Sequence, residues 1–372
     1  LEQGKINKPY KRLWISSVTD KAIRDGFNNL QDGRKYDALY ESALARAQAD
    51  WFVGINGTRA LTTKYNAQLS CGRVQTPTLA MIALREEEIR QFKPETYYGL
   101  SAYANNVKFT WREQKTNNAN IFDENHIQNI KTKIQTKPLE ITEVSTNRKK
   151  MGAPLLYDLT ELQRDANKKY GFSAKQTLNA MQSLYERYKM LTYPRTDSRH
   201  LSKDIIPTLK ERVQSINVGD YRSQVAKILQ APIKMQGNVI NDKLVSDHHA
   251  IIPTEQKANI AALNDAERKI YDLVVRRFMA TLMPSFVYDE TKIKAKIDGE
   301  VFVAKGKVVI SEGWKFAYNK ADLEKEEDEQ KLPQFKEGEI LKQVELKTTS
   351  GETTPPSRFT EASLLSAMEK PQ

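Results

Sequence analysis

Apolar residues recur every three or four positions near the start of the chain, and this spacing predicts helices. A first helix is expected over residues 19–30, with Gly33 placed to stop it. A second helix carries its apolar stripe at Tyr40, Leu44, Ala47 and Trp51. Farther along this second helix, Arg46 and Asp50 lie one helical turn apart on another face, which by itself is typical of an ordinary surface ion pair.

A third helix is expected after a loop over residues 70–75. Thr76 is the predicted N-cap and Pro77 the first helical residue, and the inward-facing residues are Leu79, Ile82 and Ala83. Arg73 and Gln75 then lie just before a helix N-terminus, where free backbone N–H groups and the helix dipole favour a phosphate. A glycine-containing loop of this kind is also often a mere connector.

Alternating apolar and polar residues predict strands on both sides of a central helical block. The expected strands are residues 97–103, 107–111, 139–144, 292–297, 301–304, 308–311 and 340–346. Aromatic residues in the strands before the helical block favour one buried face of a sheet over stacking on nucleic-acid bases. Because strands bracket the helices, we expect one sheet domain into which the helical block is inserted, with the two chain crossings forming a hinge.

The central block begins with paired helices. Asp158 and Glu161 are typical of a capping box, Gly171 suits the end of that helix, and Ser173 caps the next one. A short turn and an extended segment follow, so the order of elements is that of a winged-helix-like unit. A further amphipathic helix is expected over residues 265–283.

The composition gives the chain a net positive charge and excludes several classes of protein. The chain has 372 residues, one cysteine and a net charge of +11, so it suits a polyanionic partner and several domains. The single Cys71 excludes an intrachain disulfide, and no run is long enough to span a membrane. We therefore expect no membrane partner and a reducing cytoplasmic location. An acidic run over residues 322–329 is expected to be a solvated loop.

The stretch over residues 191–200 carries the candidate chemistry: Leu-Thr-Tyr-Pro-Arg-Thr-Asp-Ser-Arg-His. Tyr193 would be a nucleophile toward a phosphate, and Arg195 would stabilise the phenolate or the charge that builds on phosphorus. An alternative interpretation is structural, because Asp197 and Ser198 also make good helix caps and Tyr193 could simply enter a turn.

Four motifs that follow one another along the chain favour the catalytic interpretation of Tyr193. Residues 193–198 resemble the active-site motif of type IA DNA topoisomerases, in particular the bacterial topoisomerase III branch. Residues 70–79, 248–254 and 355–364 resemble further motifs of that family, in the family's order.

The resemblance implies a multidomain α+β fold, a toroid with a helical base, a β-rich hinge and an inserted tyrosine domain. The domains it implies are 1–92 (helical base), 93–150 (hinge), 151–284 (tyrosine domain), 285–350 (hinge) and 351–372 (return to the base).

The same resemblance implies roles for individual residues. Tyr193, Arg195 and His248 would be catalytic, with His248 as a hydrogen-bond donor near the scissile phosphate and His249 structural. The residues implied in DNA binding are Arg46, Arg73, Gln75, Gln163, Thr196, Asp197, Ser198 and Arg358. Asp247, His248 and His249 could form half of a metal site, but no second His or Cys cluster completes it, so no metal ligands are assigned.

In the family, the tyrosine cleaves single-stranded DNA to give a 5′-phosphotyrosyl link, a second strand passes, and the break is resealed without ATP. The family holds Mg²⁺ in an acidic domain called TOPRIM, and no such acidic motif occurs in this chain. We therefore expect a piece of a longer enzyme, a monomer that binds single-stranded DNA, holds no cofactor itself, and is catalytically deficient without a TOPRIM domain in trans. The topoisomerase III branch, which the chain resembles, favours decatenation over relaxation. We expect the chain to act near the nucleoid or a plasmid.

Two alternatives remain open at this stage. The first is a non-catalytic module that binds single-stranded nucleic acid on the same scaffold. The second is a tyrosine recombinase or relaxase, but the clustered arginines and histidines of the former and the histidine-rich metal site of the latter are not visible in the sequence.

Overall fold

The computed structural model describes residues 8–15, 20–319 and 330–369. The acidic run predicted as a solvated loop lies outside these ranges. Of the described helices, none combines the length and the apolar character that crossing a membrane requires.

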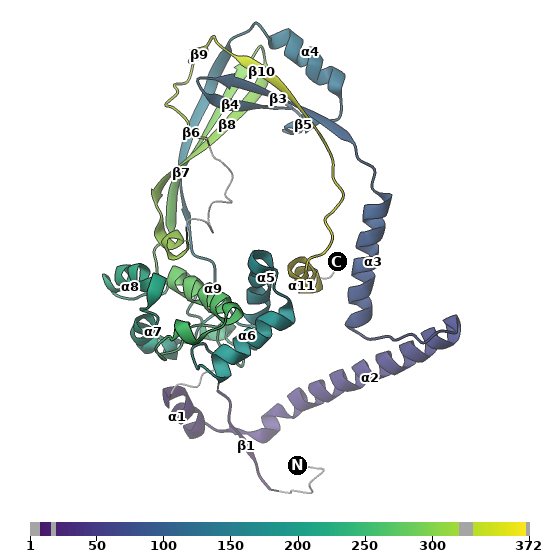
Figure 1. Ribbon diagram of the computed structural model, residues 1–372, viewed down its shortest axis with the longest axis vertical. Helices are drawn as coiled ribbons and strands as arrows, with labels where there is room; N and C mark the ends of the chain where they lie inside the picture. The colour runs from purple at the N-terminus through teal and green to yellow at the C-terminus, as the bar shows by residue number, and fades with distance from the viewer. Residues whose placement is uncertain (1–7, 16–19, 320–329, 370–372) are drawn as a thin grey trace.

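The described strands after residue 95 form one curled antiparallel sheet, drawn at the top of Figure 1. Its order is β10-β3-β4-β8-β7-β6-β9, and β5 pairs with β3. The strands are β3 (Thr96–Ala104), β4 (Val107–Arg112), β5 (Asn120–Ile121), β6 (Leu139–Met151), β7 (Phe286–Ile297), β8 (Glu300–Ser311), β9 (Ile340–Leu341) and β10 (Glu345–Glu352). Strands from before and after the helical block thus belong to one sheet, as the sequence predicted.

The sheet buries one face against helix α4 (Glu124–Ile134), which the sequence analysis did not predict. Three isoleucines of α4 lie in the same core as Phe109 and Trp111. These two side chains alternate with Lys108 and Thr110 along β4, so the buried face follows the two-residue period of a strand. The aromatic residues of β4 are therefore core residues.

One long strand, β8, replaces the two strands predicted over residues 301–304 and 308–311. Within this strand Gly306 leaves space for Leu332, whose side chain would lie 2.5 Å from a β-carbon at that position. Conversely, the single strand predicted over residues 340–346 is two, β9 and β10, at different positions in the sheet.

The helical block folds around its own core. Its helices are α5 (Leu159–Tyr170), α6 (Ala174–Glu186), α7 (Leu209–Ser215), α8 (Arg222–Leu229) and α9 (Asp265–Thr281). Short 3₁₀ helices complete it: η2 (Lys203–Thr208), η3 (Gly219–Tyr221), η4 (Asp242–Leu244), η5 (Ile260–Ala262) and η6 (Gly313–Ala317). The core includes Ala317, so the block extends into the chain that follows β8.

Local signals set the ends of these helices. Asp158 caps α5, Ser173 caps α6, and Gly171 ends α5 in a left-handed conformation, φ 69°. The reciprocal capping box lies elsewhere, at the start of α9, where Asn264 and Glu267 each accept the other's backbone N–H.

The described N-terminal elements form a limb with little core. They are β1 (Lys11–Arg12), α1 (Asp20–Asn28), β2 (Gln31–Asp32), η1 (Gly33–Tyr36), α2 (Asp37–Tyr65) and α3 (Gln75–Gln91). Helix α3 begins before the predicted cap, with Val74 at the N-cap position, and Thr76 instead accepts the Gly72 N–H with its hydroxyl. The prediction of an inward-facing Leu79 is wrong, because that side chain is 66 % exposed.

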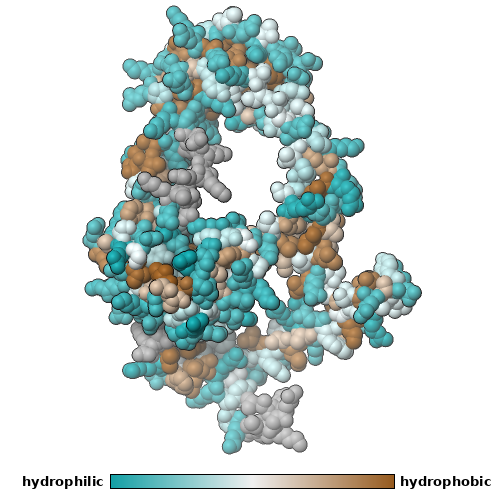
Figure 2. All heavy atoms as spheres, viewed as in Figure 1, coloured by the Kyte–Doolittle hydropathy of each residue, from teal (hydrophilic) through white to brown (hydrophobic). Residues whose placement is uncertain are grey.

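Neither α2 nor α3 has a buried residue. The apolar stripe predicted for α2 exists, but it faces no core within the described chain: Tyr40 is 66 % and Trp51 60 % exposed. Figure 2 shows apolar side chains at the surface of this limb. Exposed apolar faces of this extent mark interaction surfaces.

The chain returns to the helical block after β10, and we call residues 353–360 the return segment. It runs from the sheet to α11 (Glu361–Glu369), which packs on α5 (Figure 1). Arg358 pairs with Glu86 of α3, so this segment follows the α3 limb. Sheet, helical block and limb together surround a central opening that remains when all side chains are drawn (Figure 2).

Candidate nucleic-acid site

The extended segment that carries Tyr193 is held inside the helical block. It leaves α6 through a turn in which Lys189 adopts a left-handed conformation, φ 57°, and then runs antiparallel to the segment after His249. Thr192 donates its N–H to the Ile252 carbonyl at 3.0 Å, and its hydroxyl accepts the Ile252 N–H at 3.0 Å. Tyr193 therefore projects from backbone that is fixed on a packed core.

Two rings contact the side chain of Tyr193. The His248 ring lies at a centroid distance of 4.3 Å and an angle of 39°, and the Tyr185 ring stands edge-on at 5.5 Å and 84°. Tyr193 itself is half-buried, and its neighbour Arg195 is exposed. Of the sequence-predicted catalytic residues, Tyr193 and His248 are thus in ring contact, and Arg195 is exposed two residues along the chain. The sequence analysis assigned no role to Tyr185.

Polar residues after Arg195 bond mainly within the block. Thr196 donates its hydroxyl to the His248 carbonyl at 2.9 Å, and Ser198 donates to the Leu244 carbonyl at 2.8 Å. Both residues are buried. Asp197 is exposed and accepts the Ser246 hydroxyl at 2.6 Å. These bonds fix the shape of the loop, and contact of the three residues with DNA stays a prediction.

Arg199 anchors the far end of the same loop, a role that the sequence analysis did not assign. It donates to the Leu156 carbonyl at 3.0 Å, at the entry of the chain into α5. Asp158, the N-cap of α5, is partly buried, and burial raises the pKa of its carboxyl above the usual value. The Tyr193 segment is therefore tied to the start of α5 as well as to α6.

A second group of predicted DNA-binding residues lies on the limb. Arg73 pairs with Asp50 of α2, so Asp50 does not form the ordinary pair with Arg46 that helical spacing suggests. The hydrogen bond from Arg73 lowers the pKa of the Asp50 carboxyl, and Arg46 adds a smaller effect in the same direction. Gln75 is exposed at the start of α3.

Arg358 and Gln163 complete the predicted set. Arg358 is bidentate to Glu86, with bonds of 2.8 and 3.1 Å, and this lowers the pKa of the Glu86 carboxyl. Gln163 of α5 donates to the Ala174 carbonyl at 3.0 Å, which joins the ends of α5 and α6. The structure thus places the predicted residues in two groups, one on the helical block and one on the limb.

Metal ligands are lacking among the described residues, where no group of three or more His, Cys, Asp or Glu side chains could hold an ion. His249 is buried, and its Nδ1 lies 2.7 Å from the Ala250 carbonyl. The donor set that Mg²⁺ prefers, several oxygen ligands around one point, does not occur in this part of the chain. We assign no step of the chemistry to a metal held by these residues.

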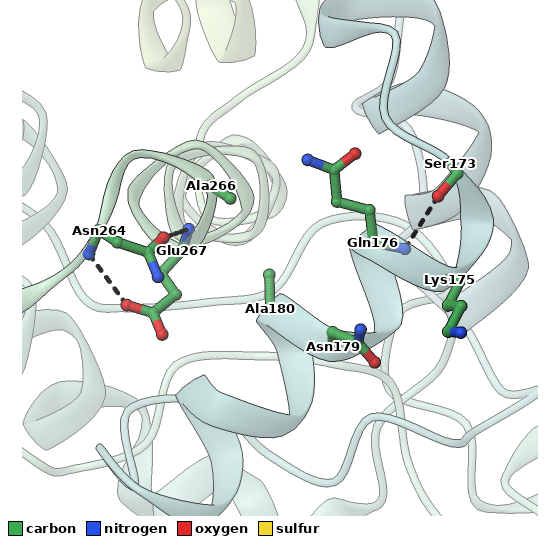
Figure 3. Close-up of a pocket in the computed structure, with 8 residues that line it drawn as sticks. All are labelled: Ser173, Lys175, Gln176, Asn179, Ala180, Asn264, Ala266 and Glu267. Carbon is green, nitrogen blue, oxygen red and sulfur yellow. Dashed lines mark hydrogen bonds between the residues drawn. The ribbon is translucent and has the colours of Figure 1, made fainter.

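A pocket of about 370 Å³ lies between the first turns of α6 and α9 (Figure 3). Two of its polar side chains cap helix ends: Ser173 accepts the Gln176 N–H at 3.1 Å, and Glu267 accepts the Asn264 N–H at 2.9 Å. It is lined by neither Tyr193 nor Arg195, so we assign it no ligand.

Acid should weaken the helical block through His249. Burial lowers the pKa of this imidazole below its usual value, whereas the unfolded chain takes up the proton near pH 6.5. The stabilising contribution is therefore complete above that pH and is lost as pH falls toward the folded-state pKa. We expect the melting temperature to drop between pH 8 and pH 5.5, and to drop less in His249→Gln.

His126→Gln is the matched control for this prediction, because His126 is exposed on α4. It should leave the pH dependence of the melting temperature unchanged. An unaltered acid dependence in His249→Gln would show that other groups cause it.

Comparison with known proteins agrees with this arrangement. A family model described as DNA topoisomerase matches residues 34–372. The chain is 56 % identical over 373 aligned positions to DNA topoisomerase 3 of Bacillus licheniformis and 54 % identical over 374 to that of Bacillus subtilis. All of this chain is covered in both cases, and it spans about half of those relatives, 51 % of each.

A solved structure agrees as well. Full-length topoisomerase I from Thermotoga maritima superposes with a TM-score of 0.70 at 26 % sequence identity, over 96 % of this chain and 58 % of the other. The fold, the family model and the relatives lead to one conclusion: the chain belongs to the DNA topoisomerases, in the topoisomerase III branch of the type IA family.

Proposed function

We propose that this chain is the strand-cleaving and strand-passing part of a type IA topoisomerase, with Tyr193 as nucleophile. The observation that carries the proposal is the placement of Tyr193. Its ring rests between His248 and Tyr185, on backbone fixed at Thr192 and Arg199, with the exposed Arg195 two residues on. This is a pre-organised site that remains open to a polyanion.

The reaction we assign to the site exchanges one phosphate ester for another. The Tyr193 oxygen forms a bond to phosphorus and loses its proton, and the bond from phosphorus to the 3′ oxygen breaks. The 3′ oxygen takes up a proton, so the products are a 5′-phosphotyrosyl link and a 3′-hydroxyl. Arg195 can bond two phosphate oxygens at once, and His248 can donate a further hydrogen bond. Religation is the reverse reaction and needs no ATP, because the ester energy is kept.

The central opening would receive the passing strand in this proposal, in keeping with the family's toroid and inserted winged-helix-like tyrosine domain. We divide the chain into 1–92 and 351–372 (base), 93–150 and 285–350 (hinge), and 151–284 (tyrosine domain).

The exposed apolar face of α2 and α3 supports contact with a further domain. The described residues hold no Mg²⁺ site, and the chain spans about half of its relatives. We therefore assign this face to contact with a TOPRIM domain, which would bring Mg²⁺ to the site. In this proposal the enzyme acts in the cytoplasm as a monomer. The chain alone should bind single-stranded DNA and relax no supercoils. Robust Mg²⁺-dependent relaxation by the pure chain, abolished in Tyr193→Phe, would contradict this.

Single-stranded DNA should bind this chain more tightly than the matching duplex. The affinity should fall with salt, with a logarithmic slope of roughly 0.7 for each phosphate contacted. Arg195→Ala and Arg73→Ala should each reduce that slope by about one contact. Fluorescence anisotropy with a labelled oligonucleotide and its duplex, across a salt titration, measures both quantities.

Asp50→Asn is the matched variant for this test, because it removes the carboxylate that pairs with Arg73. If Arg73 contacts phosphate, the variant should bind DNA at least as tightly as the unchanged chain. Equal and weak binding of single strand and duplex would mean that only general basicity acts, and would argue against a formed groove.

A non-catalytic module that binds single-stranded nucleic acid is the second candidate. The absence of metal ligands among the described residues favours it for the isolated chain. The two candidates differ in covalent chemistry, since a binding module loses nothing when the Tyr193 hydroxyl is removed.

A further inference from the structure

We propose that Tyr185 is a positioning residue for Tyr193, acting through ring contact and not through contact with DNA. The proposal rests on the assignment of Tyr193 as nucleophile and extends it to a residue on the preceding helix. Tyr185 lies in the last turn of α6, and its ring meets the Tyr193 ring at 84° with 5.5 Å between centroids. This is the edge-to-face geometry that aromatic pairs prefer.

The two aromatic neighbours restrain Tyr193 in different ways. His248 lies against the ring in a tilted stack at 39°, whereas Tyr185 meets it almost at a right angle. Two rings therefore lie against Tyr193 at different inclinations, and together they limit the room in which its side chain can turn. A nucleophile must reach phosphorus in line and at about 3–3.5 Å, so a restrained phenol reacts more often than a free one.

The turn between the two tyrosines is built to bring them together. Met190 donates its N–H to the Leu184 carbonyl at 2.9 Å, which closes the end of α6. Thr254 then donates its hydroxyl to the Lys189 carbonyl and its N–H to the Met190 carbonyl, at 2.5 and 3.1 Å. The chain reverses within these few residues.

Lys189 accepts a conformation at φ 57° that lysine rarely adopts. Strain of this kind persists where the surroundings fix it and gathers at functional sites. The Lys189 ammonium also lies 5.7 Å from the centre of the Tyr185 ring. The ring that meets Tyr193 is thus itself contacted by an exposed cation of the turn.

The test reads the Tyr193 ring directly in this chain. 3-Fluorotyrosine is placed at position 193, and its ¹⁹F resonance is compared with that of the free amino acid. Ring currents from the two neighbours should displace the resonance. Tyr185→Leu should move it toward the free value, and Tyr185→Phe should keep the displacement because the ring remains. Tyr188→Leu is the control, since the Tyr188 hydroxyl bonds the Ala262 carbonyl and not the site.

The melting temperature of each variant shows whether it folds, and Tyr185→Met replaces Tyr185→Leu if the latter does not. A resonance that stays unchanged in a folded Leu or Met variant would overturn the proposal. Loss of the displacement in Tyr185→Phe would do the same, because it would mean that the hydroxyl and not the ring acts.

A second arm measures formation of the covalent adduct with labelled single-stranded DNA, in the presence of a TOPRIM-containing partner polypeptide. Tyr185→Leu should lower kcat by about tenfold to a hundredfold with little change in KM, and Tyr185→Phe should restore it. An unchanged kcat in Tyr185→Leu would contradict positioning. If no variant and no unchanged chain forms an adduct, the proposed function fails, while the ¹⁹F result still decides whether Tyr185 holds the ring.

Discussion

Replacing Tyr193 with phenylalanine is expected to abolish covalent attachment of this chain to single-stranded DNA, with a loss on the order of 10⁶-fold in rate. The ring contacts with His248 and Tyr185 do not use the hydroxyl, so the variant should fold and bind DNA as before. The measurement is recovery of a protein–DNA adduct on a denaturing gel, with a TOPRIM-containing polypeptide and Mg²⁺ added to the unchanged chain and to the variant.

Arg195→Lys provides a graded comparison for that experiment. It keeps the positive charge but removes the planar fork, so binding should persist while adduct formation falls. An adduct that forms at the normal rate in Tyr193→Phe would show that another nucleophile acts.

Removal of the Arg277 guanidinium should destabilise the helical block more than any surface change, by about 3 kcal/mol or more. Arg277 of α9 is 7 % exposed and donates to Asp165 at 2.7 Å and to the Tyr157 hydroxyl at 3.0 Å. It also bonds the Leu155 carbonyl at 2.9 Å and the Tyr318 hydroxyl at 3.2 Å. Arg277→Ala would leave the buried Tyr157 hydroxyl and three half-buried groups without this donor.

Thermal or urea unfolding of Arg277→Ala, followed by circular dichroism, measures this effect. Asp165→Asn, made alone and together with Arg277→Ala, completes a double-mutant cycle. The double variant should lose less free energy of unfolding than the two single variants lose together. A change below about 0.5 kcal/mol in Arg277→Ala would mean that water replaces the guanidinium. In that case Arg277 would not be what holds the Leu155 and Tyr318 segments together.

The sequence predicted most of the elements because their signals are local. Asp158, Gly171 and Ser173 each act on the nearest helix end, and the structure confirms all three. Alternation along β4 predicted a strand with a buried aromatic face, and the structure confirms it. The sheet built from both sides of the helical block is also confirmed, since strands bracketing helices leave few other ways to bury their apolar faces.

What could not be predicted depends on partners that lie far along the chain or outside it. Leu79 belongs to an apolar stripe, but a stripe does not say whether anything covers it, and in the described chain nothing does. The packing of Leu332 at Gly306 in β8 is a contact between residues far apart in the sequence, and it has no local signal. Likewise, Asp50 pairs with Arg73 across two helices, whereas helical spacing alone favours Arg46.

The candidate site was predicted mainly through resemblance, and geometry adds to it. Tyr193 and Arg195 come from one motif and His248 from another, and the structure brings Tyr193 and His248 into ring contact. The inward bonds of Thr196 and Ser198 could not be foreseen, because their carbonyl partners belong to other segments. The position of Tyr185 could have been suspected, since the short turn after α6 must return the chain beside the last turn of the helix.

The interleaved sheet has a consequence for how the chain becomes folded during synthesis. The helical block is one continuous stretch apart from η6, so its core can form soon after α9 leaves the ribosome. Strand β3 can pair with β10 only after β10 has been synthesised. Likewise, Glu95 can form its hydrogen bond with Thr353 only when the chain is 258 residues longer. Closing such a long loop is slow and costs entropy. The arch of the molecule therefore closes last, and until then β3 and β6 keep open edges on which a chaperone or another nascent chain can pair.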